Sequence, residues 1–159
     1  MLAEILGVRK GVTAVIGSGG KTTLLRTLGE ELARSGARVI LATTTKFLPF
    51  PGIETVPGGE REVAEALGRA PIVCAAAPWG ESGKLAASPV PMVRLRALAD
   101  YVLVEADGSA GLPLKAHAPH EPVIPPQSNQ TILVLGAEGL GRTVAQAAHR
   151  PALYARLAG

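Results

Sequence analysis

A glycine-rich loop near the N-terminus is the feature that most constrains the fold. It reads Gly-Ser-Gly-Gly-Lys-Thr-Thr, follows the apolar run 12–16 and precedes a helix-like run that ends at Arg34. A strand, a glycine loop, a lysine, a hydroxyl and a helix in this order bind nucleotide phosphates in α/β proteins, because glycines let backbone N–H groups turn towards an anion. The predicted nucleotide-binding residues are Gly17, Ser18, Gly19, Gly20, Lys21, Thr22 and Thr23.

Within this loop, we expect Lys21 to reach the β- and γ-phosphates and Thr22 to offer its hydroxyl to Mg²⁺. The full-length pattern G-x-x-x-x-G-K-[ST] requires glycine at position 15, where this chain has Val15. The shorter loop is similar to that of the Mur ligases, but a Mur-ligase-like amide-forming enzyme needs an amino-acid-binding domain for which 159 residues leave no room. A surface turn is the structural alternative, and the flanking strand and helix disfavour it.

Composition indicates one globular domain over residues 1–159, with 47% hydrophobic and 18% charged residues. Aromatic residues make up 3% and the net charge is +3, which suits a small anionic ligand and not a nucleic acid. A single cysteine, Cys74, lies in an apolar run and is expected in the core. With no signal peptide and no apolar stretch of roughly 20 residues, the expected location is cytoplasmic, away from membranes.

Strand-like and helix-like segments alternate along the chain. We expect strands over residues 12–16, 38–43, 71–76, 101–106 and 131–135, and helices over 22–35, 60–69 and 92–99. Residues 47–57, 78–91 and 108–130 are expected to be loops, the first with a short edge strand. This alternation predicts an α/β, P-loop NTPase-like three-layer fold, with a mostly parallel sheet and helices on both faces. Ligands bind such sheets at the carboxyl ends of the strands.

Two acidic residues end the strand predicted over 101–106. Glu105 and Asp107 are separated by one residue, and therefore point to the same side of an extended chain. P-loop proteins hold Mg²⁺ through an acid in this position. We expect Asp107 to contact Mg²⁺ through water, and Glu105 or Asp107 to orient a water or act as a base. The alternative is that Asp107, next to Gly108, only forms a turn.

A threonine run and two lysines complete the candidate site. Residues 43–46 read Thr-Thr-Thr-Lys and follow the second predicted strand. Thr45 is a candidate Mg²⁺ ligand, although threonine is also a common strand residue. Lys46 and Lys115 are candidates for contacting a second substrate or the charge of the transition state. The residues alone do not choose between these two lysines.

The proline-rich loop after the acidic pair carries His117, His120 and Glu121, which could form a metal site. Two histidines three residues apart are a weak metal signal without further ligands, and solvated loop histidines are the alternative. The glycine-rich stretch 136–141 follows the last predicted strand, where it could contact the base or substrate or simply form turns.

These motifs resemble those of the YqeC family of selenium-dependent hydroxylase accessory proteins. The matching stretches, in the family's order, are 17–23, 43–46, 105–108, 113–116, 121–125, 136–141 and 149–151. The resemblance implies a P-loop nucleotide-binding protein in the maturation of selenium-dependent molybdenum hydroxylases, with the molybdenum cofactor or an apo-hydroxylase as partner. Family members are usually longer, with a further C-terminal segment, so by this resemblance we expect the chain to be C-terminally short.

Two functions follow as expectations. The first is an Mg²⁺-dependent enzyme that binds ATP or GTP and either hydrolyses it or transfers a phosphoryl or nucleotidyl group, with Lys21, Lys46, Glu105, Asp107 and Lys115 as catalytic candidates. The second is a non-catalytic, nucleotide-gated module that carries a cofactor or chaperones a partner. Turnover separates the two, since a switch hydrolyses nucleotide slowly without its partner.

Overall fold

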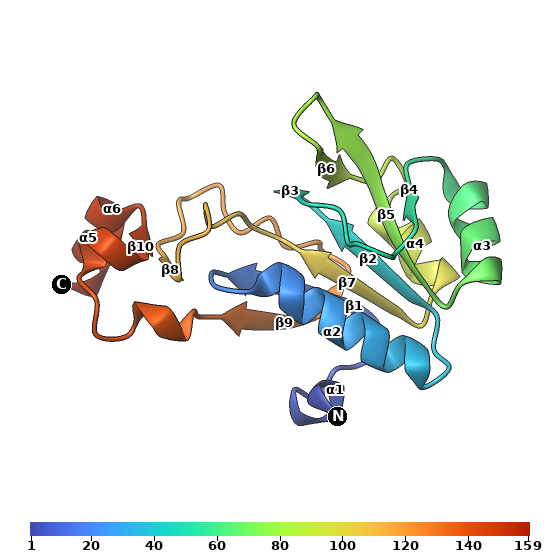
Figure 1. The fold of residues 1–159 in the computed structure, drawn as a ribbon, viewed down its shortest axis with the longest axis horizontal. Helices are drawn as coiled ribbons and strands as arrows, with labels where there is room; N and C mark the ends of the chain where they lie inside the picture. Colours follow the sequence, from blue (N-terminus) through green and yellow to red (C-terminus); the bar gives the residue numbers. More distant parts are fainter.

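The computed structural model describes all 159 residues and is built on a mostly parallel sheet (Figure 1). The five strands that the sequence predicts form its parallel centre, in the order β5-β2-β7-β1-β9. Their bounds are β1 (Gly11–Gly17), β2 (Val39–Thr43), β5 (Ile72–Trp79), β7 (Tyr101–Glu105) and β9 (Ser128–Val134). The α/β class is therefore confirmed, and β1 lies between β7 and β9.

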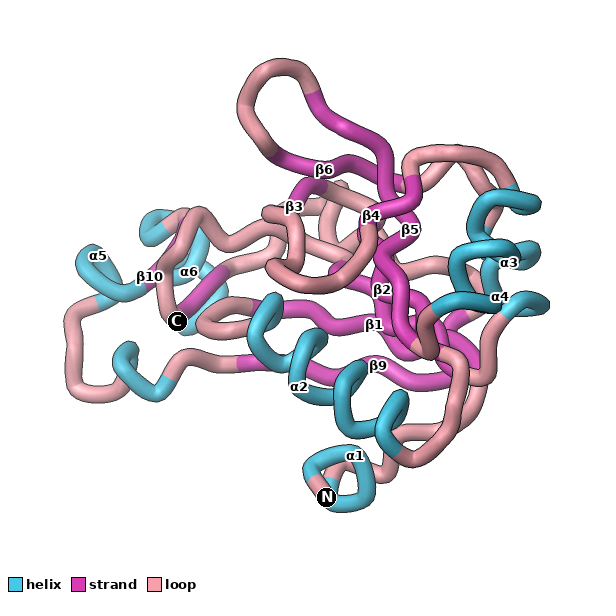
Figure 2. The backbone as a smooth tube through the Cα atoms, turned by 45° about the vertical axis from the view of Figure 1, so that its right-hand side comes forward, coloured by secondary structure: helices cyan, strands magenta, loops and turns pink.

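Helices cover both faces of the sheet (Figure 2). One face carries α1 (Leu2–Ile5) and α2 (Lys21–Arg34), and the other carries α3 (Glu60–Arg69) and α4 (Met92–Leu98). Alternate residues of each central strand face the two helix layers. In β2, for example, Leu41 packs with the α2 layer and Ile40 with the α3 and α4 layer. This alternation explains why β2 is buried along its whole length.

Helix α2 forms because its leucines recur at helical spacing. Leu25, Leu28 and Leu32 are buried against the sheet, and burying each side chain contributes about 1.5–3 kcal/mol. The helix ends before Gly36, whose φ of +89° is the left-handed conformation that terminates many helices. Cys74 of β5 is buried as expected, and burial raises the pKa of its thiol to about 12.

The expectation of a loop over residues 78–91 is wrong at residues 78–79 and 84–87, which belong to strands. Strand β5 continues to Trp79, and the chain returns as β6 (Lys84–Ala87), which pairs with β5 in an antiparallel hairpin. Strand β6 also pairs with β3 (Lys46–Phe47). The hairpin projects beyond the sheet at the top of Figure 1. The anticipated edge strand is β4 (Thr55–Val56), which pairs with β5.

A small C-terminal unit lies at the end of the molecule beyond the carboxyl ends of β1 and β9 (Figure 1). Its elements are β8 (Leu114–Lys115), the 3₁₀ turn Ala137–Gly139, α5 (Val144–Ala147), β10 (Ala148–His149) and α6 (Pro151–Ala158). Strands β8 and β10 form a separate two-stranded parallel sheet, and α6 has no buried residue. None of the helices has the length and apolar character needed to cross a membrane.

Candidate functional site

The glycine loop connects β1 to α2 and fits tightly against the turn that follows β9. Gly17 has a φ of +94°, and a Cβ there would lie 2.2 Å from the carbonyl oxygen of Val134. Gly19 has a φ of +84°, and a Cβ there would lie 2.4 Å from Cα of Gly136. Both positions therefore require glycine, for backbone conformation and for space. The glycine-rich stretch that follows β9 thus packs directly against the glycine loop.

A cavity of about 480 Å³ opens in front of this loop. It is lined by residues 20–23, by Lys46, Lys84 and Glu105, and by the segment 108–111. Gly20 is the N-terminal cap residue of α2, and no side chain caps the helix there. The first N–H groups of a helix have no partner within the helix, and its N-terminus carries partial positive charge. These features make the cavity suited to an anion.

Thr22 and Glu105 meet in this cavity. The hydroxyl of Thr22 donates a 3.0 Å hydrogen bond to Oε2 of Glu105. Glu105 comes next to the loop because β7 pairs with β1, where it lies opposite Val15. Burial raises the pKa of the Glu105 carboxyl, although the charge of Lys21 and the Thr22 hydrogen bond oppose the shift. Thr22 and Glu105 thus place two side-chain oxygens next to each other in the loop cavity, where they could bind a hard metal cation.

Asp107 is fully buried and is held by four groups. Its Oδ2 accepts a 2.9 Å hydrogen bond from the N–H of Gly17 and lies 2.7 Å from Nε2 of His117. The ammonium groups of Lys21 and Lys115 lie 3.2 Å and 3.4 Å from its carboxylate. Burial opposes ionisation, but the hydrogen bonds from Gly17 and His117 and the two lysine charges hold the pKa of Asp107 below its ordinary value. Asp107 therefore joins the loop to the C-terminal unit.

Lys21 is 4% exposed, and its ammonium is turned back into the loop. Its Nζ donates a 2.7 Å hydrogen bond to the carbonyl of Gly17 and lies 3.5 Å from the hydroxyl of Ser109. Ser18 is also buried in the loop, and its hydroxyl has no hydrogen-bond partner. The ammonium group of Lys21, which could bind a phosphate, is thus already inside the loop, where Asp107 holds it.

The ion pairs continue from Asp107 to the C-terminal unit. Lys115 Nζ lies 2.7 Å from Oε2 of Glu121, and the same oxygen lies 2.7 Å from Arg150. Although burial opposes it, the hydrogen bonds from Arg150 and Lys115 lower the pKa of Glu121 to about 2. Lys115 therefore lies in a buried network and does not line the loop cavity.

The remaining candidates lie beside the loop cavity. The hydroxyl of Thr43 donates to the carbonyl of Glu105 at 2.9 Å, and the N–H of Thr45 donates to that hydroxyl at 3.0 Å. Thr45 faces a neighbouring cavity instead of the loop, whereas Lys46 lines both. The Nζ of Lys46 lies 3.7 Å from the centre of the Trp79 ring.

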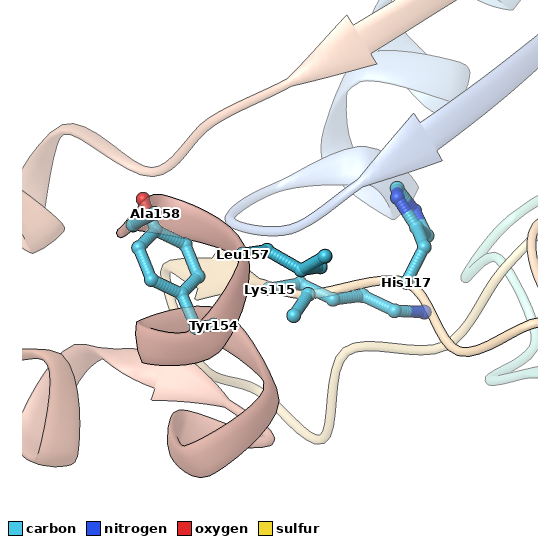
Figure 3. Close-up of a pocket in the computed structure, with 6 residues that line it drawn as sticks. Lys115, His117, Tyr154, Leu157 and Ala158 are labelled. Atoms are coloured by element: carbon cyan, nitrogen blue, oxygen red, sulfur yellow. The ribbon is translucent and has the colours of Figure 1, made fainter.

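His117, His120 and Glu121 are not brought together as a metal site. His117 contacts Asp107, Glu121 contacts Lys115, and no group of three or more histidine, cysteine or acidic side chains is arranged to hold a metal. A third cavity, of about 330 Å³, lies between the segment 115–117 and α6 (Figure 3). Tyr154 and Leu157 line it from α6, and Lys115 and His117 line it from the facing segment.

Sequence reasoning missed Ser109, which lies near Lys21, and two residues of the β5–β6 hairpin. Lys84 lines the loop cavity and Trp79 supports Lys46, and both lie on the β5–β6 hairpin that the sequence did not predict. The available signal was the pair of glycines at 80 and 83, which mark a turn between two short apolar stretches.

Comparisons with known proteins agree with the sequence resemblance. The family described as "YqeC protein" matches residues 13–152. The YqeC protein of Escherichia coli (strain K12) is 37% identical over 158 residues, which cover 95% of this chain and 62% of that protein. This chain therefore spans less than two thirds of the length of that relative. No solved structure matches. The family match over most of the chain shows that this protein belongs to the YqeC family.

Proposed function

We propose that this protein binds ATP or GTP with Mg²⁺ at the glycine loop, and hydrolyses it or transfers its phosphoryl or nucleotidyl group. One observation carries the proposal: the uncapped N-terminus of α2, Lys21 and the Thr22–Glu105 pair all belong to one loop cavity. Backbone N–H groups and Lys21 would neutralise phosphate charge, and the cavity, about 480 Å³, has the size of small-molecule sites.

The donor set also fits Mg²⁺. This ion takes one or two protein oxygens and keeps several waters, so it needs no cluster of three acids. The hydrogen bond between Thr22 and Glu105 supports Thr22 as a direct ligand and Glu105 as the acid that holds an Mg²⁺-bound water. Bound Mg²⁺ would supply charge neutralisation at the phosphates. Asp107 already binds Lys21 and Gly17, and we propose that it keeps Lys21 in place instead of contacting the metal.

The biological role of this binding site is proposed from the family resemblance. YqeC family membership and the resemblance of the motifs support a role in the maturation of selenium-dependent molybdenum hydroxylases. The molybdenum cofactor or an apo-hydroxylase would then be the partner, in the cytoplasm.

A nucleotide-gated carrier or chaperone is the second candidate. The observation that favours it is the continuous chain of ion pairs from Lys21 through Asp107, Lys115 and Glu121 to Arg150. A phosphate that draws Lys21 away from Asp107 would change this chain and bias the position of the C-terminal unit. Slow turnover that accelerates only with a partner would favour this candidate over an enzyme that acts alone.

Calorimetric titration of ATP and of GTP, each with and without Mg²⁺, tests the proposal. We expect micromolar, Mg²⁺-dependent binding of one nucleotide. Lys21→Ala should weaken it at least about 100-fold, since Lys21 makes charge-assisted contacts with phosphate. Lys10→Ala is the matched control, because Lys10 is exposed at the opposite end of β1. Absence of binding, or equal binding by Lys21→Ala, would reject the phosphate loop.

A further inference from the structure

A second cavity adjoins the loop cavity. It measures about 530 Å³ and lies between the β5–β6 hairpin and the segments that follow β2 and β7. The two cavities share Lys46, Lys84 and Gly108 in their linings. The boundary between them therefore consists largely of two lysine side chains.

The charge of this second cavity is positive. Lys46 and Lys84 are both exposed and neither forms an ion pair. Glu121 is the one acid in the lining, and Lys115 and Arg150, each 2.7 Å away, neutralise it. Two ammonium groups without a carboxylate partner therefore face the same space. Such an arrangement favours an anionic ligand.

The threonine run adds hydrogen-bonding groups to the same cavity. Thr44 and Thr45 both line it. The hydroxyl of Thr44 donates to the carbonyl of Val123 at 2.7 Å, which fixes its position and leaves its oxygen as an acceptor. The hydroxyl of Thr45 lies 3.4 Å from that of Thr43, in a weak contact that a ligand can replace.

Lys46 is positioned at this boundary by the hairpin. Its Nζ lies 3.7 Å from the Trp79 ring, within the range of a cation–π interaction. This contact, and the pairing of β3 with β6, hold the end of Lys46 between the two cavities. An anion in the second cavity can thus bind Lys46 without displacing the main chain.

We propose that the second cavity binds a small molecule that carries a phosphate or carboxylate group, and that this molecule is the second substrate. The role as second substrate rests on the proposed nucleotide site, whereas the binding of an anion does not. Lys46 and Lys84 would contact the anion from one side and the nucleotide phosphates from the other. The competing occupant is the nucleotide itself, whose sugar or base could extend into the same space.

Trp79 provides a direct readout because it is the only tryptophan in the chain and it lines this cavity. Inorganic phosphate and citrate are titrated separately, at constant ionic strength, while tryptophan emission is recorded. Wild-type protein is first saturated with Mg²⁺ and a non-hydrolysable nucleoside triphosphate, so that the loop is filled. Lys21→Ala is titrated without nucleotide. We expect a saturable change in tryptophan emission in both proteins. The anion that binds more tightly shows whether the cavity prefers a phosphate or a carboxylate group.

Three variants locate the binding. Lys46→Met and Lys84→Met should each lower the affinity for the tighter-binding anion at least about tenfold, because each loses a charge-assisted contact. Lys10→Met removes the same charge at an exposed site far from the hairpin, and should change nothing. The inference would be overturned by the absence of a saturable change, by equal affinity in all variants, or by a change that occurs in Lys21→Ala without nucleotide but not in the nucleotide-saturated wild type. Because Lys21→Ala is titrated without nucleotide, failure of the proposed nucleotide site would leave this result interpretable.

Discussion

Glu105 and Asp107 are two residues apart, yet their surroundings give them different tasks. Glu105 faces the loop cavity and contacts Thr22, whereas Asp107 is enclosed by Gly17, His117 and two lysines. Burial raises the pKa of Glu105, while the partners of Asp107 lower its pKa despite burial. The first is therefore suited to a ligand that brings positive charge, and the second to a fixed structural ion pair.

Substitution of Glu105 by glutamine tests this division. We expect Glu105→Gln to weaken Mg²⁺ binding in the presence of nucleotide at least about tenfold, because a carboxylate that supports bound water is lost. The free energy of unfolding should stay within about 1 kcal/mol, since Gln keeps an oxygen for the Thr22 hydroxyl and removes a buried charge. Titration of Mg²⁺ at fixed nucleotide measures the first quantity and urea denaturation the second. Unchanged Mg²⁺ affinity would move the metal role to other oxygens.

Asp107→Asn should instead act on stability. The change leaves Lys21 and Lys115, which are 4% and 1% exposed at their side chains, without their shared carboxylate. Breaking a buried ion pair at one partner costs about 3–5 kcal/mol. Urea denaturation at neutral pH measures the loss. A loss below about 1 kcal/mol, the size of one ordinary hydrogen bond, would show that Asp107 does not anchor the two lysines.

Glu121 predicts a pH dependence of stability. Its carboxyl has a pKa of about 2 in the folded protein, against 4.5 for an unperturbed glutamate. A lowered folded-state pKa gives a stabilisation that is present above pH 4.5 and is lost as the pH falls towards 2. The free energy of unfolding should therefore fall more steeply across this interval in the wild type than in Glu121→Gln. Parallel pH profiles of the two proteins would contradict the assignment.

At the scale of elements, the tight contact between the glycine loop and the β9 turn gives a matched pair of substitutions. Gly17 and Gly20 both have a positive φ, but a Cβ at Gly17 would collide with Val134, whereas at Gly20 it would meet nothing within 4 Å. Gly20→Ala should cost about 1–2 kcal/mol, from backbone conformation alone. Gly17→Ala should cost more than about 3 kcal/mol, because the backbone of the loop or of β9 must also move. Equal losses by thermal denaturation would argue against this packing.

Elements with strong local signals could be predicted from sequence. The helix over 60–69 has the predicted ends, and its apolar residues recur at helical spacing, while β2 and β7 are nearly continuous apolar runs. Strands β3, β8 and β10 have two residues each, which is too few for any periodicity, and their pairing depends on tertiary contacts. The contact between Asp107 and His117 likewise depends on the path of the loop between them.

At the scale of the whole molecule, strand order brings the site together. Because β1 lies between β7 and β9, the glycine loop has the acidic pair on one side and the turn at Gly136 on the other. The sequence could indicate that each motif follows a strand, but it could not show which strands are neighbours. The β9 edge is left with Leu133 57% exposed on the face opposite α2.

The last part of the C-terminal unit, residues 144–158, has few contacts with the rest of the chain, which predicts that it opens separately from the sheet. Helix α6 buries no residue, and this segment is held by the pairing of β10 with β8 and by Arg150, which binds Glu121 and the carbonyl of Ala116. Arg150→Gln should speed amide hydrogen exchange in residues 144–158 at least about tenfold, the effect of losing about 1.4 kcal/mol of local stability, while the central strands keep their protection. Hydrogen exchange followed by mass spectrometry measures both regions in one experiment. Arg156→Gln is the control, because Arg156 lies on α6, which begins directly after Arg150, and forms no ion pair. Faster exchange in the central strands as well would mean that the unit and the sheet unfold together.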